Sequence, residues 1–385
     1  MFTLVVEGWR AYAQSHSIVN QFQCLELLKR GDVRLFHVEA PHPPAGFLKV
    51  GSWKVATGLL PAASEAAIAA IPEPPSGLVP DATFRLAFPF DFSSAPRGRT
   101  FVFAVAEGKR LNQYMVAGNR ALPEVLGNDV TVVTPSGFSR TRLIASGVPA
   151  HRAVVVPHGV DTQTFRPSAD AERMAQRRKR GIAADDFVFL NVGALYDRKG
   201  IPSLLKAFAA IASRHENARL VLKGIDSVYG SRAAVAAMMA KLSAAERRAT
   251  EGKISYRGGE LSYRDLADLY RSADVLVSPY QLEGFNMPVL EAVACGLPVI
   301  CTAGGPTDDF TRDSFAWRID SDLVELDGGS ERLMPDQDHL VHLMDKSLED
   351  RSFRPRAMAT GPAFAAENYA WDKVTDRLVE VLRGR

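Results

Sequence analysis

The sequence is poor in cysteine, lacks a long apolar run and carries almost no net charge. Its three cysteines, Cys24, Cys295 and Cys301, lie in apolar segments and form no CxxC pair, which argues against a disulfide framework or a structural zinc site. No apolar run approaches the about 18 residues of a membrane-spanning helix, and Met1–Glu7 lacks the basic start of a secretion signal. The net charge of +2 disfavours a dedicated nucleic-acid binder. We therefore expect a cytoplasmic protein.

What is present is an alternation of β-rich runs with helical patterns, which predicts an α/β fold with parallel sheets and crossover helices. The predicted strands are Thr3–Glu7, Val33–Val38, Thr83–Phe88, Thr100–Ala106, Asp129–Thr134, Ala153–Val156, Phe187–Asn191, Arg219–Leu222, Ile254–Arg257, Val275–Ser278 and Pro298–Cys301. The predicted helices are Ser17–Arg30, Ser64–Ala70, Phe138–Ser146, Ile201–Arg214, Ser231–Ala249, Tyr263–Ser272, Pro288–Ala294 and one or two within Pro362–Arg385. A linker at Pro157–Pro167 separates two such arrays, so we expect two doubly wound domains.

The most informative stretch is Glu283–Glu291, of sequence EGFNMPVLE, which follows a predicted strand and opens a helix. Gly284 permits a sharp turn close to a ligand, and Pro288 fits an early helical position. Unpaired N–H groups at this helix start are suited to an anion, and the Glu291 carboxylate is suited to a ribose diol. The alternative is a simple helix start with a glutamate that favours the helix dipole.

A second stretch, Gly193–Gly200, follows the predicted strand Phe187–Asn191 and precedes a helix. Ligands of open α/β sheets bind outside the carboxyl ends of strands, and this loop lies at such an end. Adjacent Arg198 and Lys199 would suit a diphosphate, because one offers a bidentate fork and the other a point charge. The alternative is a solvated basic loop.

Together with Pro157–Asp161 and Leu297–Ile300, these two stretches resemble the retaining glycosyltransferases of family four. The resemblance covers roughly residues 129–310. It implies two facing Rossmann-like doubly wound domains of the GT-B type with an interdomain cleft. The acceptor-binding domain would comprise residues 1–160 with about 363–385, and the donor-binding domain residues 161–362.

The resemblance implies roles for the charged residues of both stretches. Arg198 and Lys199, after Gly193 of the phosphate loop, would hold the donor diphosphate and stabilise the charge that builds as the sugar leaves. Glu283 would contact hydroxyls of the donor sugar, and Glu291 would bind the nucleotide ribose. Many relatives have Arg directly after the loop glycine, where this sequence has Ala194, so Arg198 would supply that charge.

The resemblance also implies backbone contacts. The N–H groups of Phe285, Asn286 and Met287 would face the phosphates, and Gly258 and Gly259 would hold the base. The family is described as retaining, with the leaving phosphate assisting deprotonation of the acceptor, so no protein nucleophile is named.

Candidates for acceptor contacts come from the loop after the first strand, where the family places its reacting sugar. They are Tyr12, Ser15 and His16; Glu107, at the end of another apolar strand, is a candidate base or acceptor ligand. The alternative is that Ser15 or Ser17 caps the following helix while His16 is merely exposed.

No metal site is predicted. Two Asp-x-Asp patterns, Asp320–Asp322 and Asp336–Asp338, are placed in polar loops, and a hard cation needs several convergent oxygens. The basic run Arg173–Arg180 could touch anionic lipid, but a solvated helix face is the simpler interpretation.

These observations predict a metal-independent glycosyltransferase without a cofactor. It would move a sugar from a UDP- or GDP-sugar to a glycan, lipid-linked or small-molecule acceptor, with retention, in the cytoplasm or peripherally at the inner membrane face. Glu283 and Glu291, about 12 Å apart if helical, suit two ends of a sugar nucleotide better than one hydrolysed bond. The alternatives are a sugar-nucleotide epimerase of the same fold and a non-catalytic nucleotide- or glycan-binding homologue.

Overall fold

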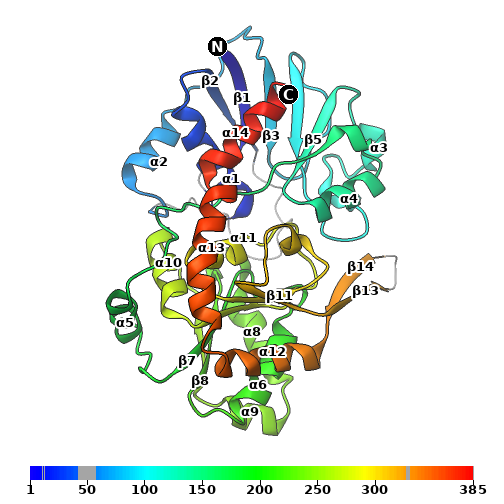
Figure 1. Ribbon diagram of the computed structural model, residues 1–385. Coiled ribbons are helices and arrows are strands. Elements are labelled where there is room, and N and C mark those ends of the chain that lie inside the picture. Colours follow the sequence, from blue (N-terminus) through cyan, green and yellow to red (C-terminus); the bar gives the residue numbers. More distant parts are fainter. Residues whose placement is uncertain (11, 13, 42–57, 327–329, 385) are drawn as a thin grey trace. The chain divides into compact units, whose positions relative to one another are not determined.

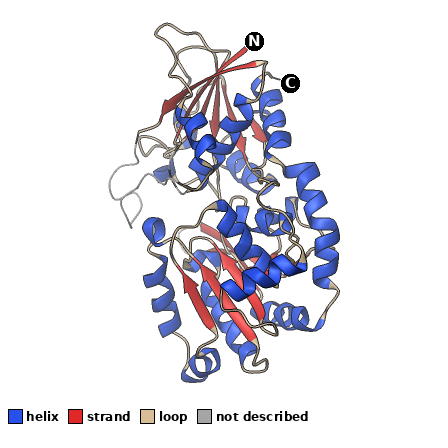
Figure 2. Ribbon diagram, turned by 90° about the vertical axis from the view of Figure 1, so that its left-hand side faces the viewer, coloured by secondary structure: helices blue, strands red, loops and turns tan. Residues whose placement is uncertain are grey.

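A computed structural model describes residues 1–384 except 11, 13, 42–57 and 327–329. The chain divides into two compact units, of which the second is Val160–Asn368 and the first comprises the described residues up to Gly159 and from Tyr369 onwards. In Figures 1 and 2 each unit has a twisted sheet with helices packed against it. The predicted α/β class with two Rossmann-like domains is confirmed.

The first unit has a six-stranded parallel sheet in the order β2-β1-β3-β4-β5-β6. Its strands are β1 (Phe2–Gly8), β2 (Val33–Glu39), β3 (Ala82–Leu86), β4 (Arg99–Phe103), β5 (Val130–Thr134) and β6 (Ala153–Val155). Its helices are α1 (Ser15–Leu28), α2 (Ala62–Ala69), α3 (Leu122–Val125), α4 (Gly137–Ala145) and α14 (Trp371–Leu382). The order reverses between β1 and β3, which is where such a sheet offers a ligand crevice.

The second unit has a six-stranded parallel sheet in the order β12-β11-β10-β7-β8-β9. Its strands are β7 (Phe187–Val192), β8 (Ala218–Lys223), β9 (Ile254–Arg257), β10 (Val275–Ser278), β11 (Val299–Thr302) and β12 (Ala316–Ile319), and an antiparallel hairpin adds β13 (Ser321–Leu326) and β14 (Ser330–Pro335). Its helices are α5 (Asp170–Lys179), α6 (Ile201–Ala212), α7 (Asp226–Tyr229), α8 (Ser231–Ala240), α9 (Ala244–Thr250), α10 (Tyr263–Ser272), α11 (Met287–Ala294), α12 (Gln337–Glu349) and α13 (Phe353–Tyr369). Here the order reverses between β7 and β10.

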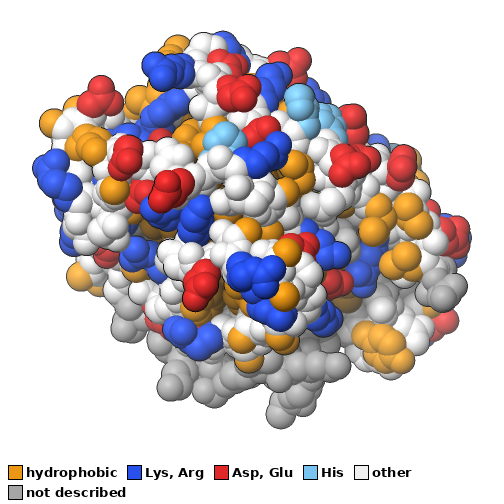
Figure 3. Space-filling model, turned by 90° about the horizontal axis from the view of Figure 1, so that it is seen from below, with side chains coloured by type: hydrophobic (Ala, Val, Ile, Leu, Met, Phe, Trp, Pro, Cys, Tyr) orange, Lys and Arg blue, Asp and Glu red, His pale blue; other side chains and the backbone are white. Residues whose placement is uncertain are grey.

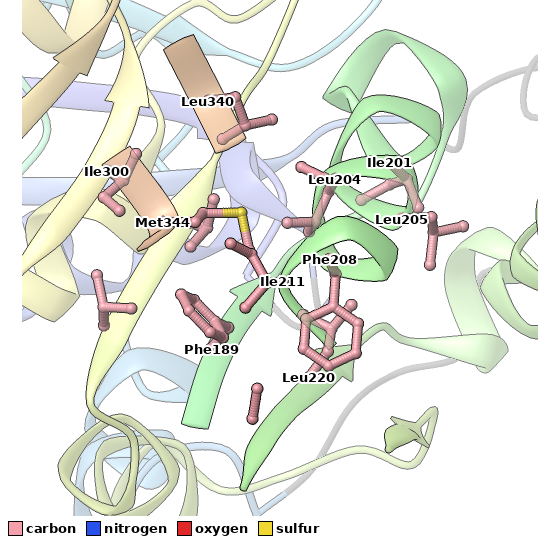
Figure 4. Packing of buried hydrophobic residues seen from close by; sticks show 14 of the residues in the cluster. Phe189, Ile201, Leu204, Leu205, Phe208, Ile211, Leu220, Ile300, Leu340 and Met344 are labelled. Carbon is pink, nitrogen blue, oxygen red and sulfur yellow. The ribbon is translucent and has the colours of Figure 1, made fainter. Parts of the chain in front are cut away.

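The core of the second unit lies between its sheet and the helices α6 and α12 (Figure 4). The apolar residues of α6 recur at helical spacing and contact Phe189 of β7 and Leu220 of β8. Leu340 and Met344 of α12 close the cluster from the side of β11. This packing fixes α6 and therefore the loop that enters it from β7.

Helix α14 packs against α1 in the first unit. Trp371 stacks on Phe22 with ring centroids 5.2 Å apart and an interplanar angle of 3°. Arg383 donates to Asp32 at 2.8 Å at the other end of α14. The C-terminal helix is therefore part of the first unit, although the whole second unit precedes it in the sequence.

Three predicted helical features are corrected by the structure. The helix expected over Ser231–Ala249 is broken into α8 and α9, because Ser243 forms a capping box with Glu246. Helix α13 begins at Phe353, ahead of the Pro362 at which the terminal helices were predicted to start, and Pro362 lies inside it.

The basic run on α5 is the third correction, because it is not wholly a solvated face. The Arg177 side chain is 1% exposed, pairs with Asp274 at 3.0 Å and donates to three backbone carbonyls. On the face drawn in Figure 3, basic and acidic side chains are interspersed. Within the described residues, no helix is long and apolar enough to span a bilayer.

Candidate functional site

The loops after β7 and β10 meet at the point where the strand order of the second sheet reverses. Gly200 makes this approach possible: its φ is +72°, and a Cβ there would lie 1.8 Å from the carbonyl oxygen of Pro279. The N–H groups of Gln281 and Leu282 donate to the carbonyl of Arg198 at 2.9 and 3.1 Å. The two sequence stretches singled out for chemistry therefore form one structure.

An ion pair joins the two loops through their side chains. Lys199 Nζ lies 2.6 Å from Glu283 Oε1, and the two side chains are 16% and 15% exposed. Lys199 also donates to the carbonyl of Leu282 at 3.3 Å. A short turn of 3-10 helix, Asp197–Lys199, precedes α6 and carries both basic residues. The contact spans 84 positions of sequence, so it is a product of the fold.

The start of α11 is shaped by an unusual cap. Asn286 adopts φ +76° and ψ +66°, and its side chain donates to Ser278 Oγ at 2.9 Å rather than capping the helix. Phe285 stacks on Phe310 with centroids 4.7 Å apart. Pro288 occupies the first turn, as predicted. The stacking of Phe285 and the hydrogen bond of Asn286 therefore hold the backbone of Phe285, Asn286 and Met287 in place.

Glu291 lies within α11 and is 9% exposed. Tyr270 of α10 donates its hydroxyl to Glu291 Oε2 at 2.7 Å. Burial raises the pKa of Glu291 to about 7, and the hydrogen bond from Tyr270 limits that rise. The Glu291 carboxyl group therefore already accepts a hydrogen bond from a hydroxyl, that of Tyr270. Its contact with a ribose diol stays a prediction.

The two glycines expected to hold a base lie directly after β9. The carbonyl of Gly258 accepts from the N–H of Asp226 at 2.9 Å, and the carbonyl of Gly259 accepts from Lys223 Nζ at 2.8 Å. A Cβ on Gly258 would lie 1.9 Å from Asp226 Oδ2, so no other residue fits there without movement. Lys223 and Asp226 were not singled out from the sequence; a lysine that ends the otherwise apolar run of β8 was the available signal.

In the first unit, His16 stands at the reversal between β1 and β3. Its ring contacts Phe88, Phe90 and Phe103 at centroid distances of 6.2, 5.9 and 5.5 Å. The ring is half-buried, and its Nε2 has no hydrogen-bond partner among the described residues. Burial lowers the pKa of His16 to about 4, against the opposing charge of Glu107. The charge of Glu107 therefore acts on the His16 ring, and acceptor contact by either residue stays a prediction.

The other two candidates from this loop, Tyr12 and Ser15, differ in their surroundings. The N–H of Tyr12 donates to Ser17 Oγ at 2.9 Å, and its buried ring packs edge-on to Trp9 with centroids 6.4 Å apart. Ser15 is exposed at the start of α1. The cap of α1 is Gln14, whose side chain accepts from the N–H of His16, so neither Ser15 nor Ser17 caps the helix.

His158, in the predicted linker, is 6% exposed and packs on Phe103 with ring centroids 5.4 Å apart. Burial and the nearby His16 lower its pKa to about 3.

The Asp-x-Asp patterns have structural roles that the sequence did not indicate. Asp336 is the N-cap of α12 and accepts from the N–H of His339 at 2.6 Å. Asp320 contacts the same histidine at 2.9 Å, and Asp322 lies in β13 rather than in a loop. Within the described ranges, no group of three or more His, Cys, Asp or Glu side chains is arranged to hold a metal ion.

The site can now be compared with known proteins. Residues 172–357 match the family model "Glycosyl transferases group 1". They include the strands β7–β14 and the two loops that meet after β7 and β10. The match bears out the predicted glycosyltransferase class for this part of the chain.

Several relatives of established function match a larger part of the chain. A GDP-mannose-dependent monoacylated alpha-(1-6)-phosphatidylinositol monomannoside mannosyltransferase of Corynebacterium glutamicum is 27% identical over 74% of this chain and 71% of the relative. A lipopolysaccharide 1,2-N-acetylglucosaminetransferase of Salmonella typhimurium is 26% identical over 68% of this chain and 64% of the relative. A D-inositol 3-phosphate glycosyltransferase of Mycobacterium bovis is 29% identical over 66% of this chain, which spans only 48% of that relative.

Solved structures share the whole fold. Anabaena HepE in complex with UDP and glucose has a TM-score of 0.69 and 13% identity, with 100% of both chains covered. WaaG, a glycosyltransferase involved in lipopolysaccharide biosynthesis, has a TM-score of 0.61 and 16% identity, again with 100% of both chains covered. At these identities the likeness concerns the fold, and it confirms the predicted pair of Rossmann-like domains.

Proposed function

We propose that the protein transfers a sugar from a nucleotide-sugar donor to a glycan, a lipid-linked sugar or a small molecule, with retention and without a metal. The observation that carries the proposal is the 2.6 Å contact between Lys199 and Glu283. It joins two glycine-containing loops beside a helix start, at the reversal point of a parallel sheet. The relatives named as mannosyl- and N-acetylglucosaminyltransferases support the same reaction class.

In this proposal Arg198 and Lys199 bind the donor diphosphate and stabilise the negative charge that develops on it. Lys199 also holds the Glu283 carboxylate, which receives hydrogen bonds from hydroxyls of the sugar. The N–H groups at the start of α11 complete the phosphate site. Glu291 accepts hydrogen bonds from the ribose hydroxyls. Its carboxylate either keeps its hydrogen bond from Tyr270 or gives it up when the ribose binds.

The acceptor contacts fall to the first unit. His16 is neutral above about pH 4, and a neutral imidazole can donate from one nitrogen and accept at the other. Its enclosed Nε2 would pair with an acceptor hydroxyl, with Tyr12, Ser15 and Glu107 around it. We further propose that the enzyme is cytoplasmic and touches the inner membrane face weakly; an acylated acceptor, such as the one in the name of the Corynebacterium relative, would require such contact.

The test begins with binding and ends with products. Thermal stability is measured against UDP, GDP, ADP, CDP, dTDP and their sugar conjugates, with Arg198→Ala in parallel. A nucleotide at 100 times its Kd stabilises the fold by about 2.7 kcal/mol. We expect a shift with one base, lost in Arg198→Ala; no shift with any nucleotide contradicts the proposal. Conversion of the sugar nucleotide without an acceptor would identify an epimerase, and binding without turnover would identify a non-catalytic protein.

A further inference from the structure

Lys223, the last residue of β8, is a lysine in an unusual position. Its side chain is 4% exposed, and its ammonium group donates to the carbonyls of Gly224 and Gly259. Burial lowers the pKa of Lys223 to about 8, while Asp226 and Glu260 oppose the shift. An ammonium group is costly to bury unless its donors are used, so the position calls for an explanation beyond packing.

The segment that connects β8 to α7, called here the β8–α7 corner, forms further hydrogen bonds with the loop after β9. Asp226 donates its N–H to the carbonyl of Gly258 at 2.9 Å and accepts a hydrogen bond from the hydroxyl of Tyr256 at 2.5 Å. Ser227 donates to Glu260 at 2.5 Å. Together with Lys223 on Gly259, these contacts attach the segment 256–260 to the β8–α7 corner. The segment therefore keeps one conformation relative to β8.

The corner also reaches the loop that follows β7. Tyr196 donates its hydroxyl to the carbonyl of Tyr229 at 2.6 Å, and the two rings meet edge-on with centroids 6.0 Å apart. Tyr229 ends the single turn of α7 that Asp226 begins. Hydrogen bonds thus run from the Gly193–Lys199 loop through α7 to Gly258 and Gly259.

We infer that Lys223 is a positioning residue for the nucleotide, whose ammonium group fixes the Gly258–Glu260 loop at one spacing from the diphosphate loop. The inference rests on the proposed function, in which the first of these loops receives the base and the second the diphosphate. Lys223 touches neither part of the donor. It acts by keeping the two subsites in register, so that a nucleoside diphosphate binds more tightly than pyrophosphate alone.

The variant Lys223→Met tests this with a matched control. Lys253 also donates to two carbonyls, those of Ala212 and His215 at 2.8 and 3.2 Å, but it precedes β9, whereas the glycine loop follows that strand. Lys253→Met therefore removes the same kind of bond from the other end of the strand. The affinities of UDP, GDP, ADP, CDP, dTDP and inorganic pyrophosphate are measured for both variants and the wild type.

We expect Lys223→Met to lose about tenfold or more in affinity for the nucleoside diphosphate that the wild type binds, and less than twofold for pyrophosphate; Lys253→Met should change neither by more than twofold. Equal affinities for wild type and Lys223→Met overturn the inference, as does an equal loss in Lys253→Met. Failure of the wild type to bind any of the five nucleoside diphosphates instead overturns the proposed function. If Lys223→Arg retains the nucleotide affinity of the wild type, the positive charge and the N–H donors of the side chain account for the effect.

If Lys223→Met does not fold, the pH dependence of the wild type decides. The charged and titratable groups around Lys223 are Asp226, Glu260, Tyr256 and, through Asp226, Arg232. The pKa is about 8 in the fold against 10.5 in an exposed lysine, so the folded protein loses this proton first and its stability rises between these values. Nucleotide affinity should fall as the pH rises from about 8 to 9, above the titration of Glu291 near 7, while stability does not. Affinity constant over this range overturns the inference.

Discussion

The two sheets reverse their strand order at comparable places but surround those places with different chemistry. At the β1–β3 reversal of the first unit stands the neutral His16, packed among aromatic rings with the equally neutral His158 nearby. The ion pair between Glu7 of β1 and Arg85 of β3 lies at the same reversal. At the β7–β10 reversal of the second unit stand the Lys199–Glu283 ion pair and the buried Glu291.

The difference indicates which ligand each reversal point is suited to bind. Aromatic rings and uncharged imidazoles favour the hydroxyls and apolar faces of a sugar. Paired charges beside a helix start favour a diphosphate and a ribose. One architecture, used twice in one chain, thus offers one site rich in aromatic rings and neutral imidazoles and another built around Lys199, Glu283 and Glu291, and the predictions below test that division.

The largest expected effect is on catalysis. Arg198→Ala combined with Lys199→Ala should lower kcat by about 10²–10³-fold, because charge developing on the leaving diphosphate loses its stabilisation. The measurement is release of nucleoside diphosphate from the donor sugar. The control is Arg247→Ala with Arg248→Ala, which removes two adjacent charges from α9 of the same unit. Near-normal turnover in the first variant would remove these residues from the site.

The prediction of the fold located the strands β1–β11 but missed β12, although Ala316 and Ile319 of that strand are buried. The core strands were located because β-branched and apolar runs are typical of sheets covered on both faces. The hairpin β13–β14 was missed, since its strands are largely exposed and carry no apolar pattern. Asp336 was assigned to a polar loop although an aspartate at the start of a helical pattern is a common N-cap.

The site could be predicted as a set of residues but not as an arrangement. Spacing and residue type identified Lys199 and Glu283, but their contact depends on Gly200 packing against Pro279, far away in sequence. The enclosure of His16 depends on Phe88 and Phe90, which arrive from the segment after β3. Lys223 carried no motif at all, because its role comes from two backbone carbonyls.

The second effect is an opposite response of the two units to acid. The pKa values of His16, His158 and His37 are about 4, 3 and 3 in the fold. As the pH falls, these histidines bind protons in the unfolded chain at a higher pH than in the folded protein. The first unit therefore loses stability as the pH falls below about 6.5. Glu291, with a raised pKa of about 7, has the opposite sign, and its unit gains stability as the pH falls from about 7 to 4.5.

Hydrogen exchange resolves the two responses, because peptides from β1 and β7 report separately on the two units. Between about pH 7 and pH 5 we expect protection of the β1 peptide to fall and that of the β7 peptide to hold or rise. Each unit of pKa shift is worth about 1.4 kcal/mol, so the difference should be a few kcal/mol. Parallel changes in both peptides would show that the histidines and Glu291 do not control the stability of their units.

A smaller effect isolates Glu291. Glu291→Gln keeps a polar group beside Tyr270 but removes the titration, so at about pH 8 it should stabilise the second unit by roughly 1–3 kcal/mol. The gain should vanish near pH 5, where the wild-type carboxyl is protonated. Glu349→Gln, an exposed substitution near the end of α12, should do neither. Urea unfolding at the two pH values measures both, and a gain that persists at pH 5 would assign the effect to packing.

The smallest effect decides whether the division of labour between the units is real. His16→Asn retains one donor and one acceptor but shortens the side chain, so the acceptor KM should rise several-fold while nucleotide affinity changes by less than twofold. The exposed His151→Asn, in the same unit, should change neither. The pKa of His16 near 4 also means that wild type and variant should share one pH profile above pH 5. A loss of nucleotide affinity as large as the rise in acceptor KM would show that His16 contributes to donor binding. The first unit would then not be specific for the acceptor.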